Sequence, residues 1–315
     1  MSFCWFLIEK SNNPRELTYS NNTLPSQVSN QIKTSSIISL LYYDGKKVRY
    51  DWKSSDIGEE TRLYGFVMSR SILSYLLGKS FCEGRIKSLN DTIGTYVKEL
   101  KGTFYGNVKI TDALNMTAGD QEFAKVKETK AIMLGEKSVF ELINEFSDRS
   151  PSKIKFFNDS VRSALAFGWV VASTSPEGFG KFASKALSQE AGFNYPSFFL
   201  ADKSNIPKDV GFYATRTDWL RAAIRIGELY NSRGCMGDYL KSATRNSVRT
   251  KEYSNRAFGK YFWLKNGKLR FNSLEMKSNA GGQRAVIDVD KGRVLIIQAI
   301  NKDYNEKIIY DAIFN

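Results

Sequence analysis

The chain has 315 residues, 42% hydrophobic and 25% charged, which is the composition of an ordinary folded protein rather than a disordered one. It contains no histidine, and this excludes Ser-His-Asp and Cys-His catalysis, because both use imidazole to carry the proton. The net charge is +13, but the basic residues are scattered rather than clustered, so we expect no nucleic-acid partner.

The cysteines and the apolar runs limit other classes of protein. Cys4, Cys82 and Cys235 are far apart and odd in number, so we expect buried free thiols rather than a zinc site or a disulfide framework. Neither a metal nor a cofactor is expected. No stretch reaches the roughly eighteen apolar residues of a membrane span. The apolar run 2–8 lacks the flanks of a signal peptide, so the sequence leaves localisation open.

The N-terminal part predicts a lead-in followed by a hairpin. Residues 1–35 are expected to be an irregular lead-in, because they are rich in Asn, Ser and Thr between positions 11 and 32, with the apolar run 2–8 as an alternative first helix or strand, or the remnant of a trimmed precursor. An apolar run at 36–43 is followed by Asp44-Gly45, a turn sequence, and then by Lys46-Lys-Val-Arg-Tyr50 as a second strand. This arrangement predicts a β-hairpin.

The middle of the chain has helical spacing. Apolar residues three and four apart predict a helix over 66–84, which Gly84 ends. A second helix is expected to begin at Thr111, whose hydroxyl would cap it, and to run to Met116. Further helices are predicted over 138–147, 160–173, 178–190 and 217–231.

The C-terminal part changes to strand periodicity. Hairpins are predicted over 261–271, around Asn266-Gly267, and over 284–298, around Lys291-Gly292. Strands at both chain ends with helices between them predict an α+β fold, with one antiparallel sheet built from both ends and flanked by helices.

Four segments carry a resemblance to a known family. They are Thr61-Arg-Leu-Tyr-Gly-Phe-Val-Met-Ser-Arg-Ser71 with Glu83-Gly-Arg-Ile-Lys-Ser-Leu-Asn-Asp91, Val108-Lys-Ile-Thr-Asp-Ala-Leu-Asn-Met-Thr-Ala-Gly119, Gly211-Phe-Tyr-Ala-Thr-Arg-Thr-Asp-Trp219 and Ala280-Gly-Gly-Gln-Arg284. In order and spacing these segments resemble motifs of the β-lactamase-related serine hydrolases. The corresponding family motifs are F-S-M-[ST]-K-S with E-G-K-I-S-L-D-D, V-T-I-x-x-L-L-x-M-T-S-G, T-x-R-D-W and G-H-G-G-Q. That family includes class C β-lactamases, penicillin-binding proteins and 6-aminohexanoate-oligomer hydrolases, whose members are often periplasmic or secreted.

The resemblance implies a β-lactamase/transpeptidase-like α/β sandwich. It covers roughly residues 36 to 300. We expect a single domain over 36–315, with a sheet lobe from 36–60 and 250–315 and a helical lobe from roughly 61–249. The helix that begins near Val67 should start at the cleft between the lobes, close to Gly281 and Gly282.

The catalytic residues of this family are replaced here. The family uses S-x-x-K, in which a Ser attacks an amide or ester and a Lys one helical turn on accepts its proton, while a Tyr from a second motif moves the proton on. The matching positions hold Val67, Arg70 and Phe157. Valine has no nucleophile, arginine stays protonated and phenylalanine has no proton to give. The second motif could be displaced by a residue or two.

Other parts of the site match the family better. The resemblance assigns oxyanion-hole N–H groups to Val67 and Gly282, and a side-chain change does not remove a backbone donor. Asn158 and Asp159 belong to the second motif, and Ala280, Gly281 and Gly282 to the third, although Asn279-Ala280 departs from the family pattern. With the charge of Arg70, these residues predict a site for a small ligand or peptide that bears a carboxylate or an amide.

Three interpretations remain open. The first is a degenerate hydrolase that acts by binding. The second is an active amide or ester hydrolase that forms an acyl-enzyme on Ser71 or Ser69. Ser71 lies about 40° from Val67 around the helix axis, and Ser69 lies about 200° from it. The third is a misplaced ordinary site, for which Ser150-Pro-Ser-Lys153 and Ser152-Lys-Ile-Lys155 match the letters in a polar, Pro-containing context.

Overall fold

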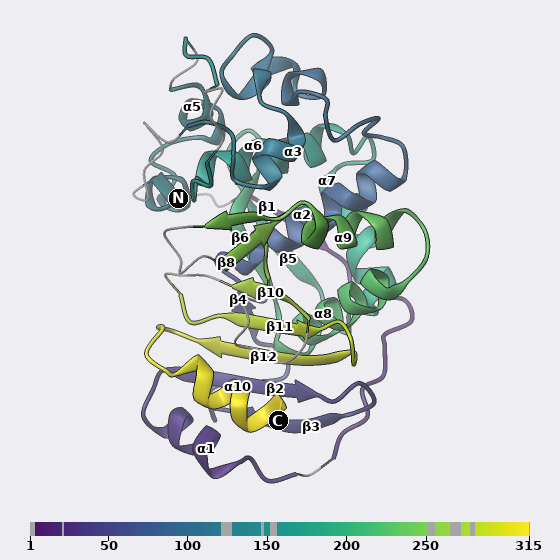
Figure 1. Cartoon of the computed structure of the whole chain (residues 1–315), viewed down its shortest axis with the longest axis vertical. Helices are drawn as coiled ribbons and strands as arrows, with labels where there is room; N and C mark the ends of the chain where they lie inside the picture. The colour runs from purple at the N-terminus through teal and green to yellow at the C-terminus, as the bar shows by residue number, and fades with distance from the viewer. Residues whose placement is uncertain are drawn as a thin grey trace.

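The computed structural model describes residues 4–20, 22–120, 128–145, 148–151, 156–250, 256–264, 272–277 and 281–314. Its largest element is an antiparallel sheet of eight strands in the order β3-β2-β12-β11-β10-β9-β8-β7 (Figure 1). The strands are β2 (Ile37–Tyr43), β3 (Val48–Lys53), β7 (Val248–Thr250), β8 (Arg256–Gly259), β9 (Phe262–Leu264), β10 (Ser273–Lys277), β11 (Arg284–Asp288) and β12 (Arg293–Ala299).

The two ends of the chain meet in this sheet. β2 pairs antiparallel with β12, with Leu40 opposite Ile297. The predicted sheet from both chain ends is therefore confirmed, as are the hairpins β2–β3 and β11–β12. In the 261–271 hairpin, β9 is present and pairs with β10, whereas the predicted strand 269–271 lies outside the described residues.

The alternation of side chains along β12 explains why both faces of the sheet are covered. Leu295 and Ile297 pack with α1 (Ser26–Lys33) and α10 (Glu306–Phe314) on one face, while Val294 and Ile296 join the main core on the other. A strand has a side-chain period of two, so a continuous apolar run indicates burial on both faces. α8 (Arg216–Asn231) covers the second face.

A second, four-stranded antiparallel sheet corrects two predictions. Its order is β1 (Cys4–Ile8), β5 (Ser197–Ala201), β6 (Pro207–Thr215) and β4 (Arg62–Tyr64). The 61–249 lobe is therefore not all-helical, and the 1–35 lead-in is not irregular throughout, because it contains β1 and α1. The sequence conceals β6 because Pro207, Asp209 and Gly211 interrupt its apolar pattern.

The predicted helices are present with shifted bounds. They are α2 (Met68–Cys82), α3 (Ile110–Leu114), α5 (Val139–Asn144), α6 (Val161–Ser173), α7 (Phe179–Ala183) with a π-helical turn at 184–189, and α8. Gly84 ends α2 with a φ of 73°, as predicted. Thr111 does not cap α3, because Lys109 holds the N-cap position and no side chain caps it. Four further helices were not predicted from the sequence, namely α1, α4 (Glu128–Leu134), α9 (Cys235–Arg245) and α10.

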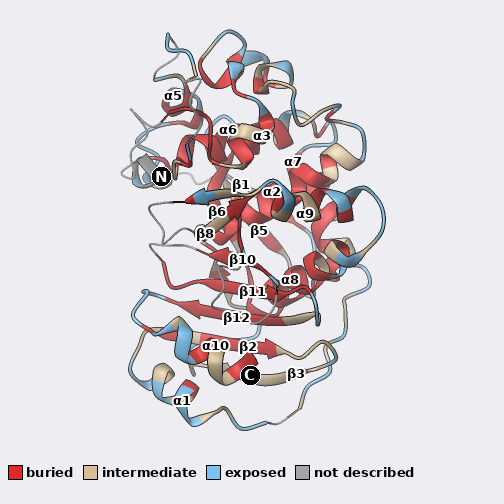
Figure 2. Cartoon of the chain, in the orientation of Figure 1, coloured by how far each residue is buried: buried red, intermediate tan, exposed pale blue. Residues whose placement is uncertain are grey.

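α2 is the central helix, and it is buried on nearly all sides. It packs against α6, α9 and β6, and of its residues from Met68 to Cys82 only Lys79, Phe81 and Cys82 are more than slightly exposed. Figure 2 shows the surrounding helices and the middle strands mostly in the colour of buried residues. Because α2 carries Arg70, Ser69 and Ser71 in this setting, these polar side chains must find partners inside the protein.

A disulfide joins the ends of two helices and corrects the expectation for two cysteines. Cys82, the last residue of α2, is bonded to Cys235, the first of α9, with their Cα atoms 5.6 Å apart. Cys4 is free and partly buried. The two bonded cysteines are 153 residues apart, so only the packing of α2 on α9 reveals the pair. Across the described residues, no helix has the length and apolar character that crossing a membrane requires.

Candidate functional site

The turn that leads into α2 is the starting point of the site. Phe66 has a φ of 47°, in the left-handed region that a bulky residue rarely adopts. Gly65 leaves no room for a side chain, because a Cβ there would collide with the ring of Trp219. The backbone therefore turns sharply between β4 and α2, and the partly exposed Val67 stands at the helix start. Backbone strain of this kind is typical of functional sites.

The third motif lies beside this turn. A Cβ built on Gly281 would lie 2.8 Å from Cδ1 of Phe66, so Gly281 contacts the residue that precedes Val67. The loop is fixed, since Tyr304 Oη donates to the Gly282 carbonyl at 2.6 Å and Arg284 Nη1 donates to the Gly281 carbonyl at 2.8 Å. The predicted proximity of the α2 start to Gly281 is thus observed. Ala280, also predicted for the site, lies outside the described residues.

Arg70 is the centre of a buried ion cluster. Its Nε donates to Oδ2 of Asp209 at 2.7 Å, and its Nη1 donates to Oδ1 of Asp159 at 3.1 Å. Arg70 and Asp209 are 4% and 0% exposed, whereas the Asp159 side chain is 30% exposed. Burial disfavours the charged guanidinium, but the two carboxylates outweigh it and raise the pKa of Arg70. Arg70 therefore stays protonated and cannot act as a base.

The ion cluster corrects the expected role of Arg70 in ligand binding. Its guanidinium already bonds two carboxylates of the same chain, so it does not offer an unpaired positive charge to a ligand carboxylate. Burial raises the pKa of the Asp209 carboxyl, and Arg70 opposes this shift. The three charged groups of Arg70, Asp209 and Asp159 depend on one another. Removing Arg70, for example, would leave a buried carboxylate without its counter-ion.

The second motif places Asp159, not Phe157, next to Arg70. The ring of Phe157 is nearly buried and packs edge-on against Phe258 and Trp263, with centroids 5.1 and 5.9 Å apart. Asp159 lies two residues further on, within the displacement that the sequence allowed. Of the alternative S-x-x-K sequences, only Ser150 and the following proline lie in the described part of the chain.

Asn158 is held by a separate buried network. Its Nδ2 donates to Oδ1 of Asp120 at 3.1 Å, and its backbone N–H donates to the Met116 carbonyl at 2.7 Å. Asp120 is fully buried and also accepts bonds from the hydroxyls of Tyr105 and Ser160. This network fixes the loop that carries Asp159, which explains how Asp159 is held towards Arg70.

The two candidate serine nucleophiles are buried and hydrogen-bonded. Ser69 Oγ accepts the backbone N–H of Phe212 at 3.1 Å, which continues the ladder of β6 beyond the end of β4. Ser71 Oγ donates to the Tyr261 carbonyl at 2.5 Å. The two serines are 0% and 1% exposed. Each hydroxyl therefore joins α2 to a neighbouring strand or turn.

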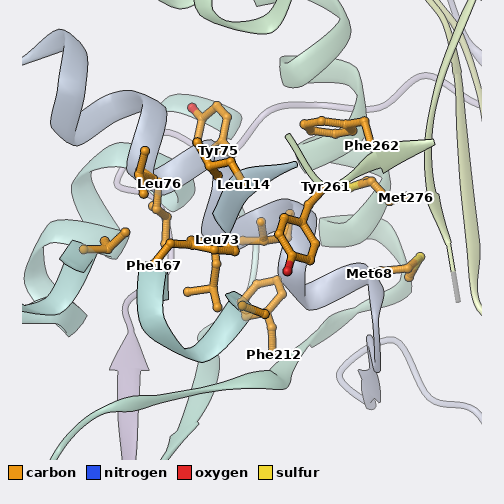
Figure 3. Packing of buried hydrophobic residues seen from close by; sticks show 14 of the residues in the cluster. Met68, Leu73, Tyr75, Leu76, Leu114, Phe167, Phe212, Tyr261, Phe262 and Met276 are labelled. Atoms are coloured by element: carbon orange, nitrogen blue, oxygen red, sulfur yellow. The ribbon is translucent and has the colours of Figure 1, made fainter. Parts of the chain in front are cut away.

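Sequence reasoning missed two residues of the site, Asp209 and Tyr261. Tyr261 lies in the turn between β8 and β9, where it and Lys260 have φ values of 63° and 48°. Its ring packs in the core near Leu73, Phe167 and Phe212 (Figure 3). Among the described residues its hydroxyl has no hydrogen-bond partner, and burial raises its pKa far above the ordinary value. No pattern marks either residue, since Asp209 lies inside a strand and the turn at 260–261 lacks glycine.

Comparisons with known proteins agree on the fold. No protein-family description matches the sequence, and no curated protein matches it either. A putative 6-aminohexanoate-dimer hydrolase from Bacillus anthracis is similar in structure, with a TM-score of 0.82, 13% identity, and coverage of 99% of this chain and 89% of that one.

Two further solved structures extend the likeness. A D-stereospecific amidohydrolase from Streptomyces sp. has a TM-score of 0.69 and 14% identity, over 92% of this chain and 99% of that one. A class C β-lactamase from Rhodobacter sphaeroides has a TM-score of 0.68 and 11% identity, over 92% and 98%. The chain therefore has the β-lactamase/transpeptidase-like α+β fold that the four sequence segments predicted.

Proposed function

We propose that this protein is a catalytically degenerate relative of the β-lactamase-related serine hydrolases and that it acts by binding. One observation carries the proposal: two carboxylates bond to Arg70 and favour its cationic form, and Arg70 is the residue that matches the family's lysine base in the sequence resemblance. Val67, at the nucleophile position, has no hydroxyl. An active hydrolase that uses Ser69 or Ser71 would first have to release that serine from a buried hydrogen bond.

The charge of the site favours an amide or amine group over a carboxylate. Asp209 and Asp159 bring two carboxyl groups to the single guanidinium of Arg70, so the cluster contains more acidic groups than basic ones. Asp159 is the partly exposed member of the cluster, with its side chain 30% exposed, so it is the carboxylate of the three-residue cluster that a ligand can reach. A ligand N–H group would bond to Asp159, and a ligand carbonyl would suit the backbone donors assigned to Val67 and Gly282. The proposed ligand is therefore a short peptide or another amide.

A thermal-shift screen tests this function. The ligands are capped dipeptide amides and the same dipeptides with free carboxylates, each tested on the parent protein, on Asp159→Asn and on Asp56→Asn. Asp56 is an exposed aspartate in the loop after β3, so its variant is the matched control. Each ligand shift is measured from the Tm of the same variant without ligand.

We expect capped amides to raise the Tm of the parent and of Asp56→Asn, and to do so far less for Asp159→Asn. Stabilisation by the carboxylates alone would contradict the charge argument. The absence of stabilisation by any ligand, or equal shifts in all three proteins, would contradict binding at this site.

A further inference from the structure

A cavity of about 220 Å³ lies away from the start of α2, among β1, the β5–β6 hairpin, α4 and α5. Its lining is rich in lysine and contains the free cysteine, with Cys4, Lys137, Lys203 and Lys208 contributing the reactive or charged groups. None of these residues has a part in the proposed function, so the cavity is an independent feature of the molecule.

Lys208 is the unusual group in this cavity. It is only 4% exposed, and among the described residues its Nζ donates to the Met133 carbonyl alone, at 3.5 Å, the outer limit of a hydrogen bond. Within the described part of the chain, no carboxylate forms an ion pair with it. Asp202 lies nearby, but its oxygens accept the backbone N–H groups of Val139, Ser204 and Ile206. The Lys208 ammonium therefore has donor capacity left for a ligand in the cavity.

Cys4 lines the same cavity. β1 pairs with β5 so that Cys4 lies opposite Ala201, and Ala201 lies opposite Pro207, the residue before Lys208. Trp5 and Leu7 point to the other face of this sheet and are 55% and 47% exposed. The Cys4 thiol and the Lys208 ammonium thus line one cavity. The thiolate is the form of cysteine that attacks disulfides.

We propose that this cavity binds a small disulfide that carries carboxylates, and that Cys4 exchanges with it to form a mixed disulfide. The Cys4 thiolate attacks one sulfur of the ligand, a new S–S bond forms, and the ligand's own S–S bond breaks. The departing half leaves as a thiolate and takes up the proton that Cys4 released, so no further oxidant is needed. Lys208 and the exposed Lys203 bind the carboxylates, while Lys137 is paired with Glu145 at 3.1 Å.

The other two cysteines are consistent with this chemistry. Cys82 and Cys235 form a disulfide, and disulfides persist in oxidising compartments, where small disulfides are also present. An odd cysteine under such conditions is the residue that pairs with a partner outside the fold.

The probes for the test are oxidised glutathione, which carries carboxylates, and cystamine, a small disulfide with amines instead. Intact-mass spectrometry follows the rate of adduct formation on the folded protein and on Cys4→Ser, Lys208→Gln and Lys203→Gln. A short unstructured peptide with one cysteine gives the intrinsic reactivity of each probe. Melting curves establish that each variant is folded, and Lys203→Gln, at an exposed position, serves if Lys208→Gln does not fold.

Relative to the peptide, we expect Cys4 to favour oxidised glutathione over cystamine by about tenfold or more, as electrostatic attraction of a ligand allows. The preference should fall in Lys208→Gln and in Lys203→Gln, and Cys4→Ser should form no adduct. Absence of any adduct on the parent, an equal preference for both probes, or a preference unchanged in both lysine variants would overturn the proposal.

Discussion

Arg70 Nε donates to Asp209 Oδ2 at 2.7 Å, which joins the central helix α2 to a buried carboxylate on the neighbouring strand β6. Removing Asp209 would leave the buried Arg70 paired with the partly exposed Asp159, and breaking a buried pair on one side costs about 3–5 kcal/mol. We therefore expect Asp209→Ala to lower the free energy of unfolding by about that amount. Asp159→Ala should cost roughly 1 kcal/mol or less, because Asp159 is 30% exposed. Urea denaturation measures both, and equal losses would contradict the burial argument.

Restoring catalysis should require more than the two residues of the S-x-x-K motif. From the sequence alone, Val67→Ser with Arg70→Lys would supply a nucleophile and a base, and Phe157→Tyr would add to it. In the structure, Asp209 and Asp159 would keep a lysine at position 70 protonated, because an opposite charge within about 4–6 Å favours the charged form. The ring of Phe157 also packs within an aromatic cluster, against the rings of Phe258 and Trp263.

We expect the double variant to hydrolyse p-nitrophenyl acetate within about tenfold of the parent, since catalytic groups that act as a unit are strongly non-additive. Adding Asp209→Asn should raise the rate further. A double variant that already forms a stable acyl-enzyme would show that the ion cluster does not control the base.

Lys260 should make stability depend on alkaline pH. Its Nζ is buried against the Tyr239 carbonyl at 3.1 Å and the Tyr239 ring, and burial lowers its pKa from 10.5 to about 8. The unfolded chain therefore binds more protons than the folded one between these two pH values, so this group makes the folded state more stable as the pH rises through that window.

The expected gain from Lys260 is on the order of 3 kcal/mol between pH 8 and 10.5. It should be absent in Lys260→Met and retained in Lys46→Met, a control at an exposed position. Urea denaturation across this pH range gives the difference between parent and variants, and parallel curves for the parent and Lys260→Met would refute the assignment.

The Cys82–Cys235 disulfide should be a major contributor to stability. It links residues 153 positions apart, and the chain-entropy relation for a loop of that length gives roughly 5 kcal/mol as an upper value. We expect Cys82→Ala with Cys235→Ala to unfold at markedly lower urea, and Cys4→Ala to be close to the parent. Reductant should lower the midpoint of the parent but not of the double variant. A parent insensitive to reductant would contradict this.

Much of the fold could be predicted from sequence, because the eight-stranded sheet has strong local signals. The β2–β3 and β11–β12 hairpins combine apolar runs with Gly-containing turns, and such patterns act over a few residues. β6 could not be predicted, since its Pro207 and Gly211 weaken the strand pattern in the sequence. In the folded chain, pairing with β4 and β5 offsets their low preference for a strand. The disulfide and α9 likewise depend on packing between distant segments.

The candidate site was predictable only in part. The substitutions at Val67 and Arg70 stand out because the surrounding motif is retained, and the contact of Gly281 with Phe66 agrees with it. The partners of Arg70 could not be found, because Asp209 belongs to a strand 139 residues away and carries no motif. Asp209 decides whether Arg70 carries an unpaired positive charge or one neutralised by a carboxylate. The state of that charge in turn decides which class of ligand the site favours.

The most direct test of the central claim is whether the protein forms an acyl-enzyme. The folded protein is incubated with a fluorophosphonate and, separately, with a penicillin, and its intact mass is then measured. Because Val67 has no hydroxyl and Ser69 and Ser71 are buried in hydrogen bonds, we predict an unchanged mass with both reagents. A stoichiometric adduct that maps to Ser69 or Ser71 would contradict the account and identify an active hydrolase with a non-standard nucleophile.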